Sequence, residues 1–192
     1  MDLVLLSGGI ESATLLHDRL RHGSLLALFV DYGQRAARRE RETARRLCAI
    51  ADVPFQEVTI PGLRMTFTRR DAWVAHVPPP ARNVLAVSLA ANVALHAGAN
   101  TVYLGIQRDD LGQRDSTPPV LAALHQVLQG LGLALETPYA ALSKAGVIRH
   151  GQTLGVDYTR TYSCLLGRVR PCGRCPQCLA RAQAFREARA RT

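Results

Sequence analysis

The sequence predicts an α/β fold built on a parallel sheet of about five strands with helices on both faces. Short apolar runs without polar alternation are typical of strands that are buried on both faces. These runs alternate along the chain with segments of helical periodicity, which is the pattern of repeated strand-helix-strand units. With 192 residues, 47% of them hydrophobic, the chain has enough apolar surface for one substantial core.

The first unit of strand, helix and strand occupies the first 30 residues. The apolar run Leu3 to Leu6 predicts a buried strand, after which two glycines turn the chain into a helix expected from Ser12 to about Arg21. Gly23 follows where helices commonly end. The apolar run at residues 25–30 predicts a second strand that is buried on both faces.

The alternation then continues up to residue 60. A helix is expected over residues 36–51, where small and apolar side chains recur at helical spacing and include Cys48, a predicted core thiol. Residues 55–60 alternate like a strand. Residues 63–82 break the pattern with polar residues and three consecutive prolines, so we interpret them as an irregular segment and a candidate lid.

The remaining residues complete the predicted sheet. Small apolar residues over 84–98 favour a helix packed closely on the sheet, and residues 101–106 and 134–136 predict two more strands. The long polar loop at residues 107–119 leaves a strand end, which makes it a candidate binding loop. Further helices are expected at residues 120–131, 144–154 and 177–189.

The formal charge of +9 comes from 24 basic residues, of which Lys144 is the only lysine. Such a charge indicates a solvated basic surface or attraction of nucleotides, nucleic acid or an acidic partner. Glu40 and Glu42 interrupt the arginine-rich residues 35–46, and no aromatic residues are interleaved, which argues against a nucleic-acid platform. We expect a cytoplasmic protein without a membrane segment, because long apolar runs and a signal peptide are missing from the sequence.

Four of the five cysteines stand close together near the C-terminus. Cys164, Cys172, Cys175 and Cys178 have the spacing Cys-x7-Cys-x2-Cys-x2-Cys. Four thiolates match a closed tetrahedral zinc site, although they could also hold an iron-sulfur cluster. A disulfide pairing is the third interpretation, which the expected compartment disfavours. Because a closed zinc site is structural, we expect it to hold the C-terminal helix against the domain.

The hexapeptide Ser7-Gly8-Gly9-Ile10-Glu11-Ser12 links the first strand to the first helix. Glycines let backbone N–H groups approach a phosphate, the serines add hydroxyl donors, and the helix dipole favours negative charge. The hexapeptide is neither a Gly-x-x-x-x-Gly-Lys loop nor a Gly-x-Gly-x-x-Gly loop. It therefore predicts a phosphate-binding site of another type, although a plain strand-to-helix turn would also use two glycines.

This loop resembles the Ser-Gly-Gly-x-Asp-Ser loop of the PP-loop ATP pyrophosphatases, and nearly the whole chain resembles the 7-cyano-7-deazaguanine synthase (QueC) family. The motifs that carry the resemblance are Ser7 to Ser12, Asp31-Tyr32-Gly33-Gln34-Arg35, Arg82-Asn83, Thr137-Pro138, Lys144, Thr161-Tyr162-Ser163-Cys164 and Cys172-Gly173-Arg174-Cys175 with Cys178 and Arg181. It implies a Rossmann-like fold of the adenine nucleotide alpha hydrolase-like type. Residues 1–155 would form the PP-loop ATP-pyrophosphatase domain, and residues 156–192 a C-terminal zinc-binding segment and helix.

The resemblance implies an ATP-dependent carbon-nitrogen ligase and, as in many family members, a homodimer. The family converts 7-carboxy-7-deazaguanine and ammonia to 7-cyano-7-deazaguanine through an adenylated carboxylate and an amide, and releases AMP and pyrophosphate. Magnesium would accompany ATP, and the zinc would be structural.

The resemblance also assigns roles to residues. The implied catalytic residues are Ser7, Glu11, Ser12 and Lys144. The implied ATP-binding residues are Leu6, Ser7, Gly8, Gly9, Ile10, Glu11, Ser12, Ala13, Thr14, Leu15, Leu16, Gln34 and Arg35. The implied substrate-binding residues are Arg82, Asn83, Asp110 and Asp115. The implied zinc ligands are Cys164, Cys172, Cys175 and Cys178.

The first loop and the loop after Asp110 depart from the family pattern. Glu11 replaces the usual aspartate, which moves the carboxylate by roughly 1.5 Å. In the loop after Asp110, Ser116 and Thr117 stand at the family's cysteine and arginine positions. Loss of that arginine removes a bidentate partner for a carboxylate, for which Arg108 or Arg114 could substitute.

These departures keep two other functions open. One is a QueC-like paralogue that transfers the activated carboxylate to another amine, such as one on a protein. The other is a non-catalytic zinc-bearing protein that binds RNA. A tRNA-thiolating pyrophosphatase is disfavoured, because it would need a catalytic cysteine, whereas Cys48 is predicted to lie in the core and the other four cysteines to bind metal.

Overall fold

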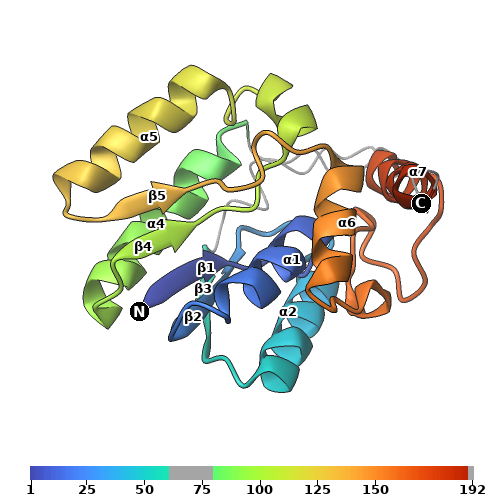
Figure 1. The fold of residues 1–192 in the computed structure, drawn as a ribbon, viewed down its shortest axis with the longest axis horizontal. Coiled ribbons are helices and arrows are strands. Elements are labelled where there is room, and N and C mark those ends of the chain that lie inside the picture. Colours follow the sequence, from blue (N-terminus) through green and yellow to red (C-terminus); the bar gives the residue numbers. More distant parts are fainter. Residues whose placement is uncertain (61–79, 190–192) are drawn as a thin grey trace.

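A computed structural model describes residues 1–60 and 80–189 (Figure 1). Its sheet has five parallel strands in the order β3-β2-β1-β4-β5. The strands are β1 (Asp2–Leu5), β2 (Leu25–Asp31), β3 (Phe55–Thr59), β4 (Thr101–Tyr103) and β5 (Ala134–Glu136). The predicted parallel sheet is confirmed. The chain runs outward from β1 to β3 and returns to β4 beside β1, so the strand order reverses between β1 and β4, where open α/β sheets bind ligands.

Helices cover both faces of this sheet, as the sequence predicts (Figure 1). They are α1 (Ile10–Arg19), α2 (Ala37–Ala51), α4 (Arg82–Ala97), α5 (Pro118–Gly130), α6 (Lys144–Thr153) and α7 (Pro176–Arg189), with 3₁₀ turns η1 (Arg108–Gly112) and η2 (Tyr158–Arg160). Along β1, Leu3 and Leu5 pack in the core under α4 and α5, whereas Val4 packs in the core under α1, α2 and α6. This alternation on a strand buried on both faces explains the unbroken apolar run.

Some element ends differ from the sequence prediction. Helix α1 begins at Ile10, two residues early, because Gly9 already takes the extended conformation of an N-cap. Strand β4 ends at Tyr103 rather than at residue 106. The Ile106 amide donates to Leu104 O, so the chain turns away from the sheet there. The candidate lid at residues 63–82 falls mostly outside the described residues.

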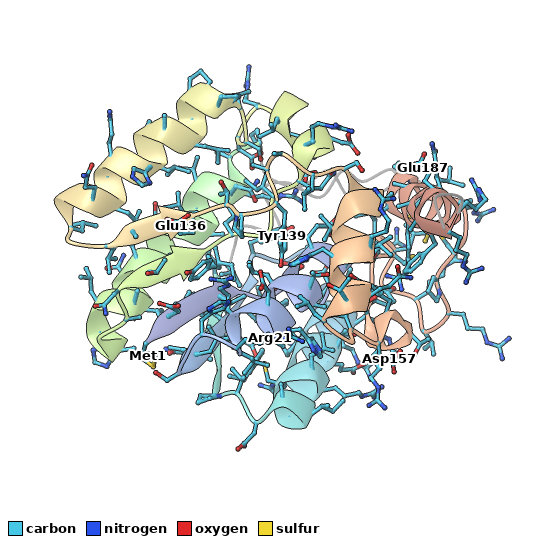
Figure 2. All side chains as sticks on the ribbon, viewed as in Figure 1. Met1, Arg21, Glu136, Tyr139, Asp157 and Glu187 are labelled. Carbon is cyan, nitrogen blue, oxygen red and sulfur yellow. The ribbon has the colours of Figure 1, made fainter. Side chains whose placement is uncertain are left out.

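The C-terminal segment shares a core with the sheet. Val156, Tyr158, Ala184 and Ala188 are buried in the same cluster as the residues under α1 and α6. On that face Tyr139, which follows β5, donates from its hydroxyl to Asp18 of α1 at 3.1 Å (Figure 2). The proposed boundary at residue 155 therefore separates segments that pack together. Cys48 is 2% exposed, which confirms the predicted core thiol. Within the described residues, no helix has the length and apolar character needed to cross a membrane.

Tyr158 joins the C-terminal segment to α1 and α6 at a point where only glycine fits. Its hydroxyl lies 2.7 Å from Thr14 Oγ1, and a Cβ on Gly151 would lie 1.9 Å from the same hydroxyl. We expect Gly151→Ala to lower the free energy of unfolding by about 1–3 kcal/mol, because overpacking forces Tyr158 to move. Urea denaturation measures the change. Gly130→Ala is the control, because a Cβ there meets no atom within 4 Å. Equal stability of the two variants would contradict this role of Tyr158.

Candidate active site

A cavity of about 220 Å³ lies at the carboxyl ends of β1, β2 and β4. Three helix starts contribute to its lining: Ser12 of α1, Arg82 of α4 and Lys144 of α6. Tyr162 and Gln177 of the C-terminal segment complete one wall. The cavity therefore lies at the reversal of strand order and gathers residues from distant parts of the chain.

The loop between β1 and α1 has the geometry of an anion site. Gly8 has a φ of +77°, and a Cβ there would lie 2.9 Å from Thr43 Cγ2, so both the conformation and the space require glycine. No side chain caps the first N–H groups of α1. Ser7 and Ser12 place their hydroxyls 3.2 Å apart beside these amides. Uncapped amides, two hydroxyls and a helix N-terminus together favour a phosphate.

An ion pair lies beside this loop in the lining of the cavity. Lys144 Nζ lies 2.5 Å from Glu11 Oε1, and their side chains are only 16% and 15% exposed. Lys144 is placed by the start of α6, where Ser143 Oγ accepts the Gly146 amide at 3.1 Å. The two charges neutralise each other, so an arriving phosphate would compete with Glu11 for Lys144.

Tyr32, Gln34 and Glu40 form the side of the cavity beyond β2. Gln34 is 7% exposed, and its amide nitrogen donates to Val30 O at 3.2 Å and to Glu40 Oε2 at 2.9 Å. Burial raises the pKa of Tyr32 to about 12, so its phenol is protonated at neutral pH. Burial also raises the pKa of Glu40, which the Gln34 hydrogen bond and the Arg82 charge oppose.

Three of the four predicted substrate residues line the cavity, and the fourth holds one of them in position. Arg82, Asn83 and Asp110 line the cavity. Asp115 is not part of the lining and is 6% exposed. Its carboxylate accepts a hydrogen bond from the backbone N–H of Asn83 at 2.8 Å, which caps the start of α4. Ser116 accepts a hydrogen bond from the Asn83 side chain at 2.7 Å. Both residues therefore fix the position of Asn83.

Among the arginines in the described part of the chain, Arg82 is the one that lines the cavity. Arg108 and Arg114, the two candidates to replace the family's loop arginine, are exposed and are not part of the lining. Gln113 Oε1 accepts a long hydrogen bond from Arg82 at 3.4 Å. The predicted polar loop thus contributes Asp110 to the cavity and supports Arg82 from outside it.

The residues of the predicted ATP loop also divide into two groups. Leu6, Ser7, Gly9, Glu11 and Ser12 line the cavity. Residues that follow along α1 pack in the core instead: Ile10, Ala13, Leu15 and Leu16 are each at most 1% exposed. Thr14 is fully buried, and its hydroxyl donates to Ile10 O at 2.8 Å. Gly8 and Arg35 are likewise not part of the lining, whereas Gln34 is.

Several lining residues were not among the predicted site residues. Tyr32 stands inside the recognised Asp-Tyr-Gly-Gln-Arg motif, so a signal for it existed. Glu40 stood out in the sequence only as a charge that interrupts the arginine-rich residues 35–46. Tyr162, Ser163 and Gln177 belong to the cysteine-rich segment, whose approach to the cavity depends on tertiary packing.

The four C-terminal cysteines converge as a candidate metal centre. Their Sγ atoms all lie within 4.8 Å of one another, and Cys164, Cys175 and Cys178 are buried. The Cys172 amide donates to Cys164 Sγ at 3.4 Å, and the Cys175 amide to Cys172 Sγ at 3.3 Å. Amides directed at sulfur favour thiolates, which are the form that binds metal. These cysteines could therefore hold a metal ion.

The cysteine-rich C-terminal segment also contacts the loop between β1 and α1. The Tyr162 amide donates to Gly8 O at 2.9 Å. Arg181 of α7 donates to Tyr158 O at 2.7 Å and to Thr161 Oγ1 at 2.8 Å, which holds α7 against the same stretch. A metal ion that fixes the four cysteines would therefore also fix the wall of the cavity that includes Tyr162.

Comparisons with known proteins agree with this architecture. The family model described as Queuosine biosynthesis protein QueC matches residues 1–189. The chain is 30% identical to 7-cyano-7-deazaguanine synthase 1 of Sulfurisphaera tokodaii over 97% of this chain and 93% of that protein. It is 33% identical to 7-cyano-7-deazaguanine synthase of Methanoregula boonei over 97% and 94% of the two chains.

Solved structures share the fold at lower identity. The U34-tRNA thiolase NcsA from Methanococcus maripaludis with its [4Fe-4S] cluster matches with a TM-score of 0.61 and 16% identity. The match covers 96% of this chain but only 63% of the thiolase. NMN synthetase from Francisella tularensis matches with a TM-score of 0.57 and 14% identity, over 90% and 70% of the two chains. From the family match and the curated relatives, the chain belongs to the QueC family of queuosine biosynthesis proteins and is an enzyme of the ATP-dependent ligase type.

Proposed function

We propose that this enzyme converts 7-carboxy-7-deazaguanine and ammonia to 7-cyano-7-deazaguanine, with cleavage of ATP to AMP and pyrophosphate. The observation that carries the proposal is the arrangement of one cavity. The uncapped start of α1, with Ser7 and Ser12, faces the only lysine of the chain. This arrangement suits binding of the ATP phosphates and charge stabilisation during adenylation.

Each step transfers one group between named atoms. A carboxylate oxygen of the substrate attacks the α-phosphorus of ATP, and pyrophosphate leaves with the bonding electrons. The ammonia nitrogen then attacks the carboxyl carbon, AMP leaves, and a proton is released to give the amide. The amide oxygen attacks a second ATP in the same way. Loss of AMP from carbon and of protons from nitrogen gives the nitrile.

The chain's own residues hold the charges that develop in these steps. The α1 amides, Ser7 and Ser12 would bind the phosphates, and Lys144 would leave Glu11 to neutralise the departing pyrophosphate. Glu11 is a carboxylate that would help to hold magnesium, which would offset the phosphate charge of ATP when bound. Arg82, Asn83 and Asp110 would surround the substrate. Gln34 and the other predicted loop residues would shape the nucleotide site.

The metal of the cysteine centre is proposed to be zinc. Four sulfurs at about 2.3 Å from one zinc ion stand about 3.8 Å apart, because the ligands are tetrahedral. Cys172 Sγ and Cys178 Sγ are 4.0 Å apart, which fits a single ion. In a [4Fe-4S] cluster each sulfur binds a different iron, so the sulfurs must spread further. Zinc with all four positions filled would be structural. A homodimer remains an expectation from the family resemblance, and a cytoplasmic location remains an expectation from the sequence.

The experiment follows ATP cleavage in the purified protein with magnesium, ammonium and 7-carboxy-7-deazaguanine. We expect AMP and pyrophosphate in equal amounts, dependent on the deazaguanine, and two AMP for each nitrile. Omission of the deazaguanine is the control for unrelated hydrolysis. Absence of AMP release would contradict the proposal and would favour the non-catalytic RNA-binding protein.

A second candidate function is transfer of the activated carboxylate to an amine on a protein. It is favoured by the altered loop, where Ser116 supports Asn83 and Thr117 precedes α5 at the positions of the family's cysteine and arginine. It predicts AMP release without nitrile when ammonium is present. A mass increase on an acceptor protein, detected by intact mass spectrometry, would support it.

Shortening the Glu11 side chain is expected to strengthen ATP binding. Glu11→Asp shortens the side chain by roughly 1.5 Å, so it weakens the contact with Lys144 and frees the ammonium group for ATP. We expect the KM for ATP to fall about two- to fivefold, the worth of a modest ion pair. Steady-state kinetics measure it, with Glu11→Gln as the comparison that removes the charge at constant length. A higher KM in Glu11→Asp would contradict this competition.

A further inference from the structure

One carboxylate of the cavity, that of Glu40, has no part in the steps proposed above. Glu40 lies on α2, is half-buried and lines the cavity. Its Oε2 accepts a hydrogen bond from Gln34. Within residues 1–60 and 80–189, no hydrogen bond to its Oε1 is present. One carboxylate oxygen thus remains available to a molecule in the cavity.

The surroundings of Glu40 favour a ligand that brings donors. The polar atoms of the Gln34 side chain already have hydrogen-bond partners. Its Oε1 accepts the backbone N–H of Tyr32 at 3.0 Å, and its Nε2 donates to Val30 O and to Glu40 Oε2. Burial raises the pKa of Glu40, which marks a carboxylate with too few partners for its charge. Two further N–H donors from a ligand would supply them.

The neighbours of Glu40 define a complementary pattern. Tyr32 keeps its phenol proton, and its electrostatic partners include both Glu40 and Arg82. The cavity therefore presents an acceptor beside two donors. The pyrimidinone edge of a guanine-type base offers the reverse: adjacent donors at N1 and the 2-amino group, then the O6 acceptor. An adenine edge alternates one donor with one acceptor, which suits a carboxylate less well.

We infer that Glu40 determines specificity for the deazaguanine base by binding N1–H and the 2-amino group, while Tyr32 and Arg82 donate to O6. The inference rests on the proposed function, because it takes the substrate to be a deazaguanine. In this inference Gln34, which the family resemblance assigns to ATP binding, is instead a positioning residue that holds the Glu40 carboxylate toward the cavity.

The test combines a near-isosteric variant with a substrate analogue. Glu40→Gln directs an amide donor at the donors of the base, so we expect the KM for 7-carboxy-7-deazaguanine to rise about 10- to 100-fold. The KM for ATP should not change. Wild-type enzyme should use the analogue that lacks the 2-amino group at least about tenfold less efficiently. In Glu40→Gln that discrimination should largely disappear.

The matched control is Glu42→Gln on the same helix. Glu42 pairs with Arg38 and Arg39 outside the cavity, so all kinetic constants should stay at wild-type values. Equal use of both compounds by the wild type overturns the inference, and this comparison stands even if Glu40→Gln folds poorly. Wild-type discrimination retained in Glu40→Gln, or a raised KM for ATP instead, also overturns it. Wild-type enzyme inactive on both compounds would refute the proposed function itself.

Discussion

Lys144→Met is expected to lower kcat/KM for substrate adenylation by about 10²–10³-fold, the usual effect of removing one group that stabilises transition-state charge. Methionine keeps the length of the stem but removes the ammonium group that lies in the cavity beside Glu11. The loss should appear in kcat, because Lys144 contacts Glu11 in the structure and would contact the leaving pyrophosphate only during the proposed reaction. Release of pyrophosphate in a coupled assay measures the change.

Two further variants separate the loss of Lys144 from its side effects. Arg149→Met on the same helix removes a cation that is not part of the cavity lining, so it should leave kcat unchanged. The double variant Lys144→Met with Glu11→Gln removes the unpaired carboxylate that the single variant leaves behind. Recovery of activity in the double variant would show that Lys144 only neutralises Glu11, which would contradict its catalytic role.

Cys178→Ser is expected to remove the metal and to cost several kcal/mol of stability, about 10 °C in Tm for a chain of this size. Cys178 is buried within the cluster of four sulfurs. Its replacement by a weaker ligand would release the metal and leave the other thiolates repelling one another. Activity should also fall, because the Tyr162 amide that contacts Gly8 lies two residues before Cys164. Elemental analysis measures the metal content, thermal denaturation measures the stability, and pyrophosphate release measures the activity.

The control for this variant is Cys48→Ala, which removes the one cysteine outside the cluster. Cys48 is packed in the core, and burial raises the pKa of its thiol to about 12, so it is a poor ligand. This variant should keep one zinc per chain. A wild-type protein with iron and labile sulfide would contradict the zinc assignment, and full metal content in Cys178→Ser would contradict the four-cysteine site.

The sequence predicts the sheet and most helices because local patterns determine them. The apolar run of β2 has no alternation, since its residues pack on both faces of the sheet. Gly8 and the serines of the first loop were predictable because an anion site demands small residues and donors at that position. The end of β4 was not predictable, because it depends on the Ile106 amide turning back to Leu104.

Roles set by tertiary contacts could not be predicted from sequence. Asp115 is a predicted substrate residue, and no pattern in the sequence indicates that its carboxylate would also cap α4 across 32 residues of sequence. Glu40 stood out in the sequence only as a charge that interrupts the arginine-rich residues 35–46, although it lies in the cavity beside Gln34. Lys144 was expected to be catalytic, and the structure adds Glu11 as its partner. In each case the sequence supplies the residue type, while the fold selects its neighbour.

The most direct test of the proposed reaction is mass spectrometry of the products formed from ATP, magnesium, 7-carboxy-7-deazaguanine and isotope-labelled ammonium. The account predicts 7-cyano-7-deazaguanine that carries the labelled nitrogen, together with AMP and pyrophosphate. Labelled amide that never becomes nitrile, or AMP without either product, would contradict it.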